Sequence, residues 1–227
     1  MSGEMIEFQV NGGTCPGYLS IPASGQGPGV IVIQEWWGLV PHIKEVADRL
    51  AGEGFVALAP DLYHGQATTS PDEAGKLMMA LRIDEVEKEL RGAVQYLIDH
   101  PATTGDKVGS IGFCMGGQLS LYAACKNPQI AACVNFYGIH PNVHPPLEEL
   151  QGAFLGLFAE RDAFVPVSAA RELEDKLKAL GKTAEVHIYP GLEHAFFNDS
   201  RPEVYNKEAA EDAWRRVLAF YRQHLSK

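Results

Sequence analysis

Short apolar runs alternate with amphipathic segments along most of this chain. The runs are continuous, as in strands buried on both faces of a sheet, and they lie at residues 29–34, 55–59, 108–113, 131–136 and 153–158. Between them, apolar residues recur at helical spacing at 43–50, 86–97, 173–180 and 210–221. Parallel strands need long crossover connections, which are usually helices. The alternation therefore predicts an α/β chain with a mostly parallel sheet.

The two ends of the expected sheet carry a different pattern. Apolar and polar residues alternate over residues 6–10, and the turn-like sequence Asn-Gly-Gly-Thr at 11–14 leads to a second such segment that ends at Ile21. This arrangement is typical of an antiparallel hairpin, which we place at one edge of the sheet. Residues 184–189 also alternate, which favours a strand near the other edge.

A helix start is visible at Ser70, which we expect to be an N-cap. Pro71 then occupies the first helical position, and Glu73 is placed to complete a capping box, so we predict a helix over 70–82. No repeat, charge block or linker divides the sequence. We expect one domain over 1–227, with three layers, about eight strands and an antiparallel N-terminal edge.

Size and charge exclude several classes of protein. A chain of 227 residues buries roughly 70% of its unfolded surface, so it needs neither disulfides nor a metal for its core. Its 19 basic and 29 acidic residues give a net charge of −10, which disfavours nucleic acid or an anionic membrane surface as partner. The continuous apolar runs are far shorter than the ~20 residues of a spanning helix, so we expect no membrane segment.

The first residues and the cysteines suggest a reducing compartment. The chain begins with MSGEMIEF, which lacks the basic start and apolar run of a secretory signal, so we expect a cytoplasmic protein. Its four cysteines include no CxxC pair of the kind found in structural zinc sites. Free thiols are therefore expected.

The most informative motif surrounds Cys114. An apolar run over 108–113 leads directly into GxCxGG, and a helical segment over 118–126 follows. This is the pattern of a nucleophile elbow with sulfur in place of oxygen, in which Gly112 and Gly116 remove side chains that would clash in the tight turn. The positive end of the following helix favours a thiolate. The alternative is a structural thiol beside a glycine-rich turn.

Two further residues complete a candidate catalytic triad. Asp162 follows the apolar run at 153–158, and His194 follows the strand expected to end near Tyr189. Both therefore lie at carboxyl ends of strands, where active sites of open α/β sheets gather. The chain order of nucleophile, acid and histidine also matches elbow enzymes. A histidine can accept the Cys114 proton while a carboxylate orients it, although Asp162 alone could be a surface or capping residue.

Glu35 and its neighbours follow another predicted central strand. The sequence Gln-Glu-Trp-Trp-Gly at 34–38 lies where such folds place an oxyanion-binding loop. The backbone N–H groups of Trp36 and Met115 are the candidate donors to a developing oxyanion, and such a donor contributes about 2.7–4 kcal/mol in the transition state. Glu35 could instead be a salt-bridged carboxylate outside the site, and Trp37 could belong to the core.

Together these segments resemble the dienelactone hydrolase family, the carboxymethylenebutenolidases of the α/β-hydrolase fold. The resemblance covers nearly the whole chain and rests on QEWWG at 34–38, APDLYHG at 59–65, GFCMGG at 112–117, NFYG at 135–138, RDAFVP at 161–166 and GLEHAF at 191–196. It implies that Cys114 is the nucleophile, His194 the base and Asp162 the residue that orients it. It also implies that Glu35 contacts the resting thiol and helps to generate the thiolate. The implied reaction is hydrolysis of an unsaturated lactone through an acyl-thioester, without a metal or cofactor.

The sequence departs from the family pattern in the substrate site. Well-studied members carry a carboxylate-binding arginine four residues after the catalytic histidine, and this chain has Asn198 there. Arg201 and Arg82 are candidate replacements, the alternative being ordinary surface arginines. Trp37 and Tyr137 match positions that line the family pocket. The resemblance therefore implies a small lactone or ester as substrate, and the departure at Asn198 leaves a neutral or bulkier ester as an open alternative.

Other sulfur and imidazole groups have simpler interpretations. Cys125 and Cys133 lie in apolar segments and are expected to be core thiols. His140 and His144 are four residues apart, but they lie in a proline-rich loop without a clear third ligand, so we expect no metal site.

Two hypotheses compete with a hydrolase. In one, Cys114 is a redox or electrophile sensor, because accessible thiols at helix starts oxidise readily. In the other, the chain is a non-catalytic ligand-binding member of its fold, because a fold does not establish chemistry. An ordered triad favours the hydrolase. The sequence leaves open whether the chain is a monomer or a homodimer.

Overall fold

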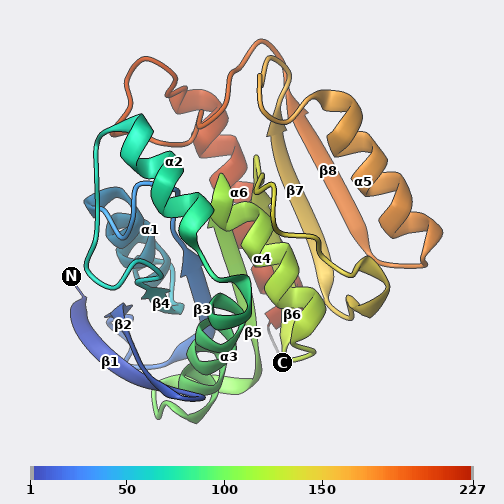
Figure 1. The fold of residues 1–227 in the computed structure, drawn as a ribbon. Coiled ribbons are helices and arrows are strands. Elements are labelled where there is room, and N and C mark those ends of the chain that lie inside the picture. The colour runs from blue at the N-terminus through green and yellow to red at the C-terminus, as the bar shows by residue number, and fades with distance from the viewer. Residues whose placement is uncertain (1–2, 226–227) are drawn as a thin grey trace.

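The central feature of the computed structural model is a mixed eight-stranded sheet (Figure 1). The structure describes residues 3–225, so two residues at each end of the domain expected over 1–227 lie outside it. The strands lie in the order β1-β2-β4-β3-β5-β6-β7-β8. They are β1 (Glu4–Val10), β2 (Gly13–Ser20), β3 (Gly27–Ile33), β4 (Val56–Pro60), β5 (Thr103–Phe113), β6 (Ile130–Phe136), β7 (Ala153–Ala159) and β8 (Ala184–Tyr189).

The pairing of the strands confirms the expected sheet. β1 pairs antiparallel with β2, β2 pairs antiparallel with β4, and every pair from β4 to β8 is parallel. The N-terminal hairpin forms one edge and β8 the other. Within the central parallel strands β3, β4 and β7, nearly every residue is buried, because helices cover both faces.

Helices cover the two faces of the sheet and make three layers. They are α1 (Pro41–Gly52), α2 (Pro71–Ala80), α3 (Ile83–Asp99), α4 (Met115–Lys126), α5 (Val167–Ala179) and α6 (Lys207–Leu225), with a short 3₁₀ helix at Leu147–Glu149. α1 and α6 pack with one face, whereas α3, α4 and α5 pack with the other (Figure 1). This architecture confirms the predicted α/β-hydrolase type of fold.

The start of α2 differs in part from the prediction. Ser70 is the N-cap, and its side chain accepts a hydrogen bond from the Glu73 N–H. The return half of the capping box is absent, because the Ser70 N–H donates to Thr68 Oγ1 and that hydroxyl donates to the Glu73 carboxylate. The helix ends at Ala80 rather than residue 82, since Arg82 already caps α3.

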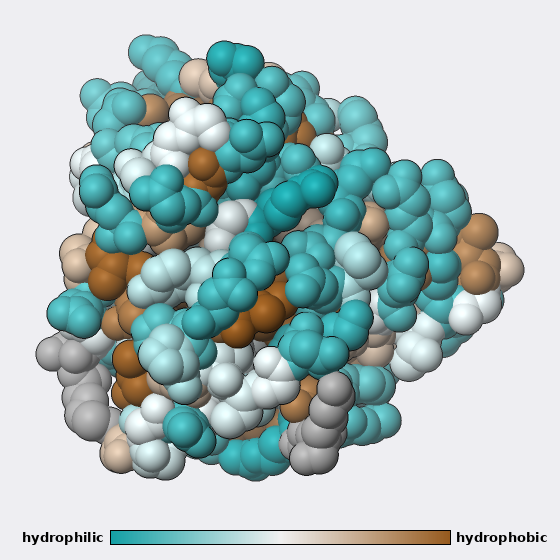
Figure 2. Space-filling view, turned by 90° about the horizontal axis from the view of Figure 1, so that it is seen from below, coloured by the Kyte–Doolittle hydropathy of each residue, from teal (hydrophilic) through white to brown (hydrophobic). Residues whose placement is uncertain are grey.

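The hydrophobic residues of the chain are gathered mainly in two buried clusters, one on each face of the sheet. On the face seen in Figure 2, hydrophobic residues form separate patches among hydrophilic ones. Single apolar side chains at a surface are ordinary. Among the described residues, no helix has the length and apolar character needed to cross a membrane.

Candidate active site

Cys114 occupies the sharp turn between β5 and α4. Its φ angle is 54° and its ψ angle −122°, an unusual conformation for a residue with a side chain. Glycines make the turn possible. A Cβ atom on Gly112 would lie 1.9 Å from the Gly116 carbonyl oxygen, and one on Gly116 would lie 2.4 Å from the oxygens of Ile33 and Gln34. The predicted reason for these glycines is therefore confirmed.

Hydrogen bonds from neighbouring segments fix the Cys114 backbone. Its N–H donates to the Phe136 carbonyl at 3.0 Å, and its own carbonyl accepts from Gly117 at 2.9 Å and from Ile139 at 3.2 Å. The side chain itself is only half-buried. The turn thus presents a partly accessible thiol at the N-terminus of a helix, where a negative charge is favoured.

Asp162 holds His194 and its own loop at the same time. Its Oδ2 lies 2.7 Å from His194 Nδ1. Its Oδ1 accepts hydrogen bonds from the backbone N–H groups of Phe164, at 2.8 Å, and Val165, at 3.0 Å. Since this carboxylate is completely buried and bonded through both oxygens, it can fix the tautomer and orientation of the imidazole.

The environment of His194 favours its protonated form. Burial lowers the pKa of His194, but hydrogen bonds to Asp162 and Cys114, and the negative charges of that carboxylate and of a thiolate, raise it to about 10. Aromatic rings flank the imidazole. Tyr137 lies on one side with 4.9 Å between ring centroids, and Phe164 lies on another at 5.1 Å. Cys114, Asp162 and His194 are therefore brought together from three strand ends.

Glu35 lies in the same buried region, directly after β3. It is 1% exposed, and its Oε2 accepts a hydrogen bond from Asn198 Nδ2 at 2.7 Å. Its Oε1 has no hydrogen-bond partner among the described residues. Asn198 thus binds a carboxylate of the protein itself.

The two candidate oxyanion donors follow two neighbouring strands of the sheet, β3 and β5. Met115 is the first residue of α4, so its N–H is one of the helix N-terminal donors that have no partner within the helix. Trp36 follows Glu35 in the loop after β3, and its ring packs against that of Trp37 at 5.0 Å. Both residues therefore follow the carboxyl end of a strand, Met115 after β5 and Trp36 after β3.

Three predicted substrate residues line one pocket of about 560 Å³. They are Trp37, Asn198 and Arg201, and they share the pocket with Thr68 and Thr69. The Arg201 guanidinium lies 6.0 Å from the centre of the Trp37 ring. Its Nε also bonds to Glu203 at the surface.

The other two predicted substrate residues are placed differently. Arg82 caps α3 and forms ion pairs with Asp84 and Glu85 in an exposed position, so no contact in the described chain joins it to the catalytic groups. Tyr137 is completely buried, and burial together with the nearby charge of Glu35 raises its pKa well above the ordinary value. Tyr137 therefore packs against the His194 ring, and its side chain is not exposed in a pocket.

Two residues near the site escaped the sequence analysis. Ser200 donates through both its N–H and its hydroxyl to Asn198 Oδ1, at 3.0 and 2.6 Å. Phe164 packs against His194, and its place in the RDAFVP motif could have suggested this. By contrast, His140 bonds to the Met78 carbonyl and the Asn142 N–H, and no group of three potential ligands in residues 3–225 is arranged to hold a metal ion.

Comparison with known proteins supports one family. The model of the "Dienelactone hydrolase family" matches residues 15–225. "Protein usf" of Aquifex pyrophilus is 42% identical over 99% of this chain and 100% of its own length. A "Putative carboxymethylenebutenolidase" of Aquifex aeolicus is 37% identical over 98% of this chain and 99% of its own. A crystal structure of a "Putative Dienelactone Hydrolase" from Klebsiella pneumoniae superposes with a TM-score of 0.89, at 30% identity and 98% coverage of both chains.

Proposed function

Because this chain belongs to the dienelactone hydrolase family, we propose that it cleaves a lactone or small carboxylic ester with Cys114 as nucleophile. Membership makes it a carboxylic ester hydrolase. The observation that carries the finer proposal is the 2.7 Å contact between Asp162 and a mostly buried His194, beside a half-buried thiol in an elbow turn. A ligand-binding protein would have no need of this combination.

The first half of the reaction forms a thioester. His194 holds the proton that leaves the Cys114 thiol, and the sulfur attacks the carbonyl carbon of the ester. The carbonyl oxygen becomes negatively charged and accepts hydrogen bonds from the N–H groups of Trp36 and Met115. When the C–O bond breaks, His194 gives its proton to the leaving oxygen. In a lactone, this oxygen remains part of the same acyl chain.

The second half releases the product. A water molecule gives a proton to His194 and attacks the thioester carbonyl, which passes through a second oxyanion at the same donors. The C–S bond then breaks, and sulfur leaves as the thiolate. The products are a carboxylic acid and an alcohol, or one hydroxy acid from a lactone. Asp162 keeps the imidazole in position through both halves.

Glu35 supplies a second carboxylate close to the nucleophile. The electrostatic environment of Tyr137 includes both Glu35 and Cys114, which supports their proximity. We assign to the unpartnered Oε1 of Glu35 the task of accepting a hydrogen bond from the resting Cys114 thiol, before the proton passes to His194. This assignment explains why a carboxylate is retained in an almost completely buried place.

The substrate's acyl side fits the pocket beside Trp37 and Arg201. An aromatic wall and a guanidinium can bind an unsaturated acyl group, with or without a negative charge. The Asn198 amide is occupied by Glu35 and Ser200, so it is not the donor that grips a substrate carboxylate. This arrangement favours neutral or bulkier esters over a strict requirement for an acidic lactone.

One assay tests the mechanism and the substrate together. Hydrolysis of a dienelactone and of an uncharged aryl ester is measured for the wild type, Cys114→Ala, Cys114→Ser and Cys125→Ala. We expect Cys114→Ala to lose turnover without unfolding, and Cys114→Ser to retain little, because a hydroxyl is far less ionised than a thiol. Cys125→Ala removes a core thiol and should remain active. Full activity of Cys114→Ala would disprove the mechanism, and turnover of the aryl ester alone would assign a neutral substrate.

A further inference from the structure

Phe164 is an exposed aromatic ring beside the catalytic histidine. At 59% exposure it is the most exposed large hydrophobic residue of the described chain. Its ring nevertheless lies edge-on to His194, with 5.1 Å between centroids. Its backbone is held by Asp162 Oδ1, while Oδ2 of the same carboxylate holds His194. One buried carboxylate therefore fixes the imidazole and this ring relative to each other.

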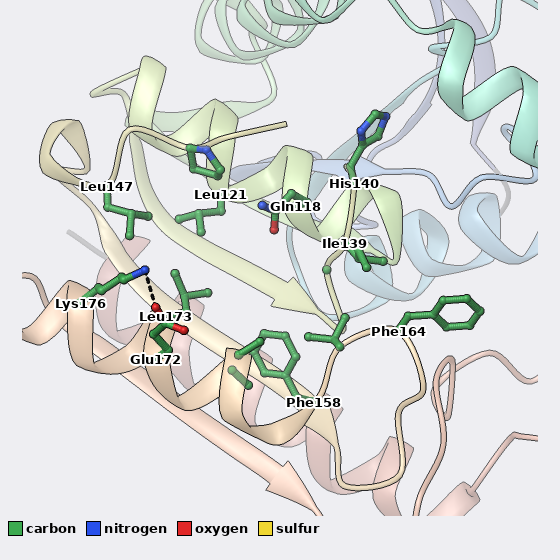
Figure 3. A pocket seen from close by; sticks show the side chains of 15 residues that line it. Gln118, Leu121, Ile139, His140, Leu147, Phe158, Phe164, Glu172, Leu173 and Lys176 are labelled. Atoms are coloured by element: carbon green, nitrogen blue, oxygen red, sulfur yellow. Dashed lines mark ion pairs between the residues drawn. The ribbon is translucent and has the colours of Figure 1, made fainter. Parts of the chain in front are cut away.

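Phe164 also lines a pocket that His194 does not line. It has a volume of about 320 Å³ and lies between α4, the loop after β6, and α5 (Figure 3). Phe164 stands at one end, and the ion pair of Lys176 with Glu172 on α5 stands at the other (Figure 3). The walls between them are mostly apolar and include Leu121, Ile139, Leu147, Phe158 and Leu173. A cavity of about 150 Å³ already accommodates benzene, so an aryl or short alkyl group fits here.

The inner wall of this pocket is connected to the nucleophile as well. Ile139 and Gln118 line the pocket, and their backbone N–H groups both donate to the Cys114 carbonyl, at 3.2 and 3.4 Å. Cys114 and His194 do not line the pocket themselves, but it borders the backbone of the elbow through Gln118 and Ile139 and the imidazole through the Phe164 ring. A group bound there would lie beside the elbow and beside the ring that packs against His194.

The position beside His194 decides which side of the ester this is. A histidine that gives a proton to the leaving oxygen must lie within about 2.6–3.2 Å of it. The alcohol side of the ester is therefore the part nearest the imidazole, and a chain on that oxygen passes next to Phe164. The pocket at Trp37 and Arg201, proposed above for the acyl side, is separate from this one.

We propose that the pocket between α4 and α5 binds the apolar alcohol group of an ester substrate, and that Phe164 is a specificity-determining residue at its entrance. This inference rests on the proposed hydrolase function. The residues at its far end, Lys176 and Glu172, neutralise each other, so the site has no preference for a charged alcohol. Substrates with an aryl or alkyl group on the leaving oxygen should be used better than methyl esters.

The test fills the pocket from its solvent-exposed rim. Ala169 lies in the first turn of α5, is exposed and lines the pocket, so Ala169→Trp narrows it without altering the core. Ala179→Trp is the matched control, because Ala179 is exposed on the same helix and does not line the pocket. Two ester series are compared, acetates of alcohols from methyl to hexyl and methyl esters of acids from acetate to hexanoate. Phe164→Ala is measured on both.

The expected effect depends on alcohol length alone. Ala169→Trp should lower kcat/KM for hexyl acetate more than about tenfold while methyl acetate and methyl hexanoate change less than about twofold. Ala179→Trp should change none of them, and Phe164→Ala should reduce the preference for hexyl over methyl acetate. An equal loss on all esters, a dependence on acyl length, or no loss would overturn the pocket assignment alone. Absence of ester hydrolysis by the wild type, or activity of Cys114→Ala, would overturn the hydrolase mechanism itself.

Discussion

The side-chain amide of Asn198 donates a hydrogen bond to Glu35 Oε2 at 2.7 Å, and both side chains are almost completely buried. The orientation of the amide is fixed, because its oxygen accepts two hydrogen bonds from Ser200. Nδ2 must therefore point to Glu35. Asn198 lies on the same loop as His194, so this bond also ties the histidine loop to the loop after β3.

Replacement of this donor by an acceptor should impair the enzyme in a pH-dependent manner. Asn198→Asp keeps the shape of the side chain but places a second carboxylate against Glu35. Two carboxylates in contact in a buried place are not both ionised. We expect kcat/KM at pH 7 to fall roughly 10–100-fold, since a lost buried hydrogen bond to a charged group costs about 1.5–3 kcal/mol. The ratio of variant to wild-type activity should rise as the pH is lowered, because a protonated carboxyl can donate again.

A matched variant separates this effect from a general change in the loop. Asn206 caps the start of α6 through its side-chain oxygen, and no hydrogen bond of the described residues joins it to Glu35. Asn206→Asp keeps that acceptor and should behave as wild type at every pH. An Asn198→Asp ratio that stays constant with pH would argue against Asn198 as the residue that positions Glu35.

The fold could be predicted well because each strand and helix carries its own pattern. The continuous apolar runs correspond to β3, β4, β5, β6 and β7, and the alternating residues 184–189 form β8 at the sheet edge. The positions of Cys114, Asp162 and His194 at strand ends could likewise be predicted, because they follow the segments that form β5, β7 and β8. Burial on both faces leaves little freedom in where these strands lie.

The partners of individual side chains could not be read in the same way. Nothing in the sequence around Glu35 indicates that Asn198, 163 residues away, binds it. Arg82 was a reasonable candidate by its charge, yet Asp84 and Glu85 on its own helix compete for it. Tyr137 matches a pocket position, but the packing of aromatic rings around His194 buries it completely. Such contacts depend on tertiary distances that local patterns do not encode.

The thiols should differ sharply in reactivity. Burial raises the pKa of Cys125 to about 12 and that of Cys133 to about 11, and it also raises the pKa of Cys15. Cys114 is half-buried and lies at a helix N-terminus. We expect iodoacetamide at pH 7.5 to modify the folded protein at Cys114 alone, as seen by peptide mass spectrometry. Denatured protein should be modified at all four cysteines. Faster labelling of Cys125 than of Cys114 in the folded state would contradict this picture.

The pairing of His194 with Asp162 should appear in the pH dependence of stability. The pKa of His194 is raised from 6.5 to about 10, so the protonated imidazole favours the folded state. This contribution is complete below about pH 6.5 and is lost as the pH rises towards 10. Asp162→Asn removes most of it but keeps an oxygen for the Phe164 and Val165 N–H groups. The melting temperature of the wild type should therefore exceed that of the variant by a few degrees at pH 6, and the gap should narrow towards pH 10.

A surface carboxylate provides the comparison for this experiment. Asp212 bonds to Arg216 and to Tyr189, neither of which titrates between pH 6.5 and 10, because the Arg216 pKa and the Tyr189 pKa are both raised above their ordinary values. The difference between the wild type and Asp212→Asn should thus stay constant over this window. If the difference in melting temperature between the wild type and Asp162→Asn is also constant with pH, the ion pair between His194 and Asp162 makes no contribution to stability.

Two glycine substitutions should have opposite effects on stability. In Gly116→Ala, the new Cβ would lie 2.4 Å from the carbonyl oxygens of Ile33 and Gln34. These are backbone atoms, so relieving the clash would require the main chain to shift. We expect this variant to lose more than about 3 kcal/mol or to fail to fold. Gly75 lies inside α2, where a Cβ would meet only the Trp36 ring at 4.0 Å. Gly75→Ala should stabilise the protein by about 0.5–1 kcal/mol through helix propensity. Urea unfolding of both variants measures these changes in the free energy of unfolding. A Gly116→Ala protein as stable as the wild type would contradict the prediction, because it would require the elbow backbone to move away from β3.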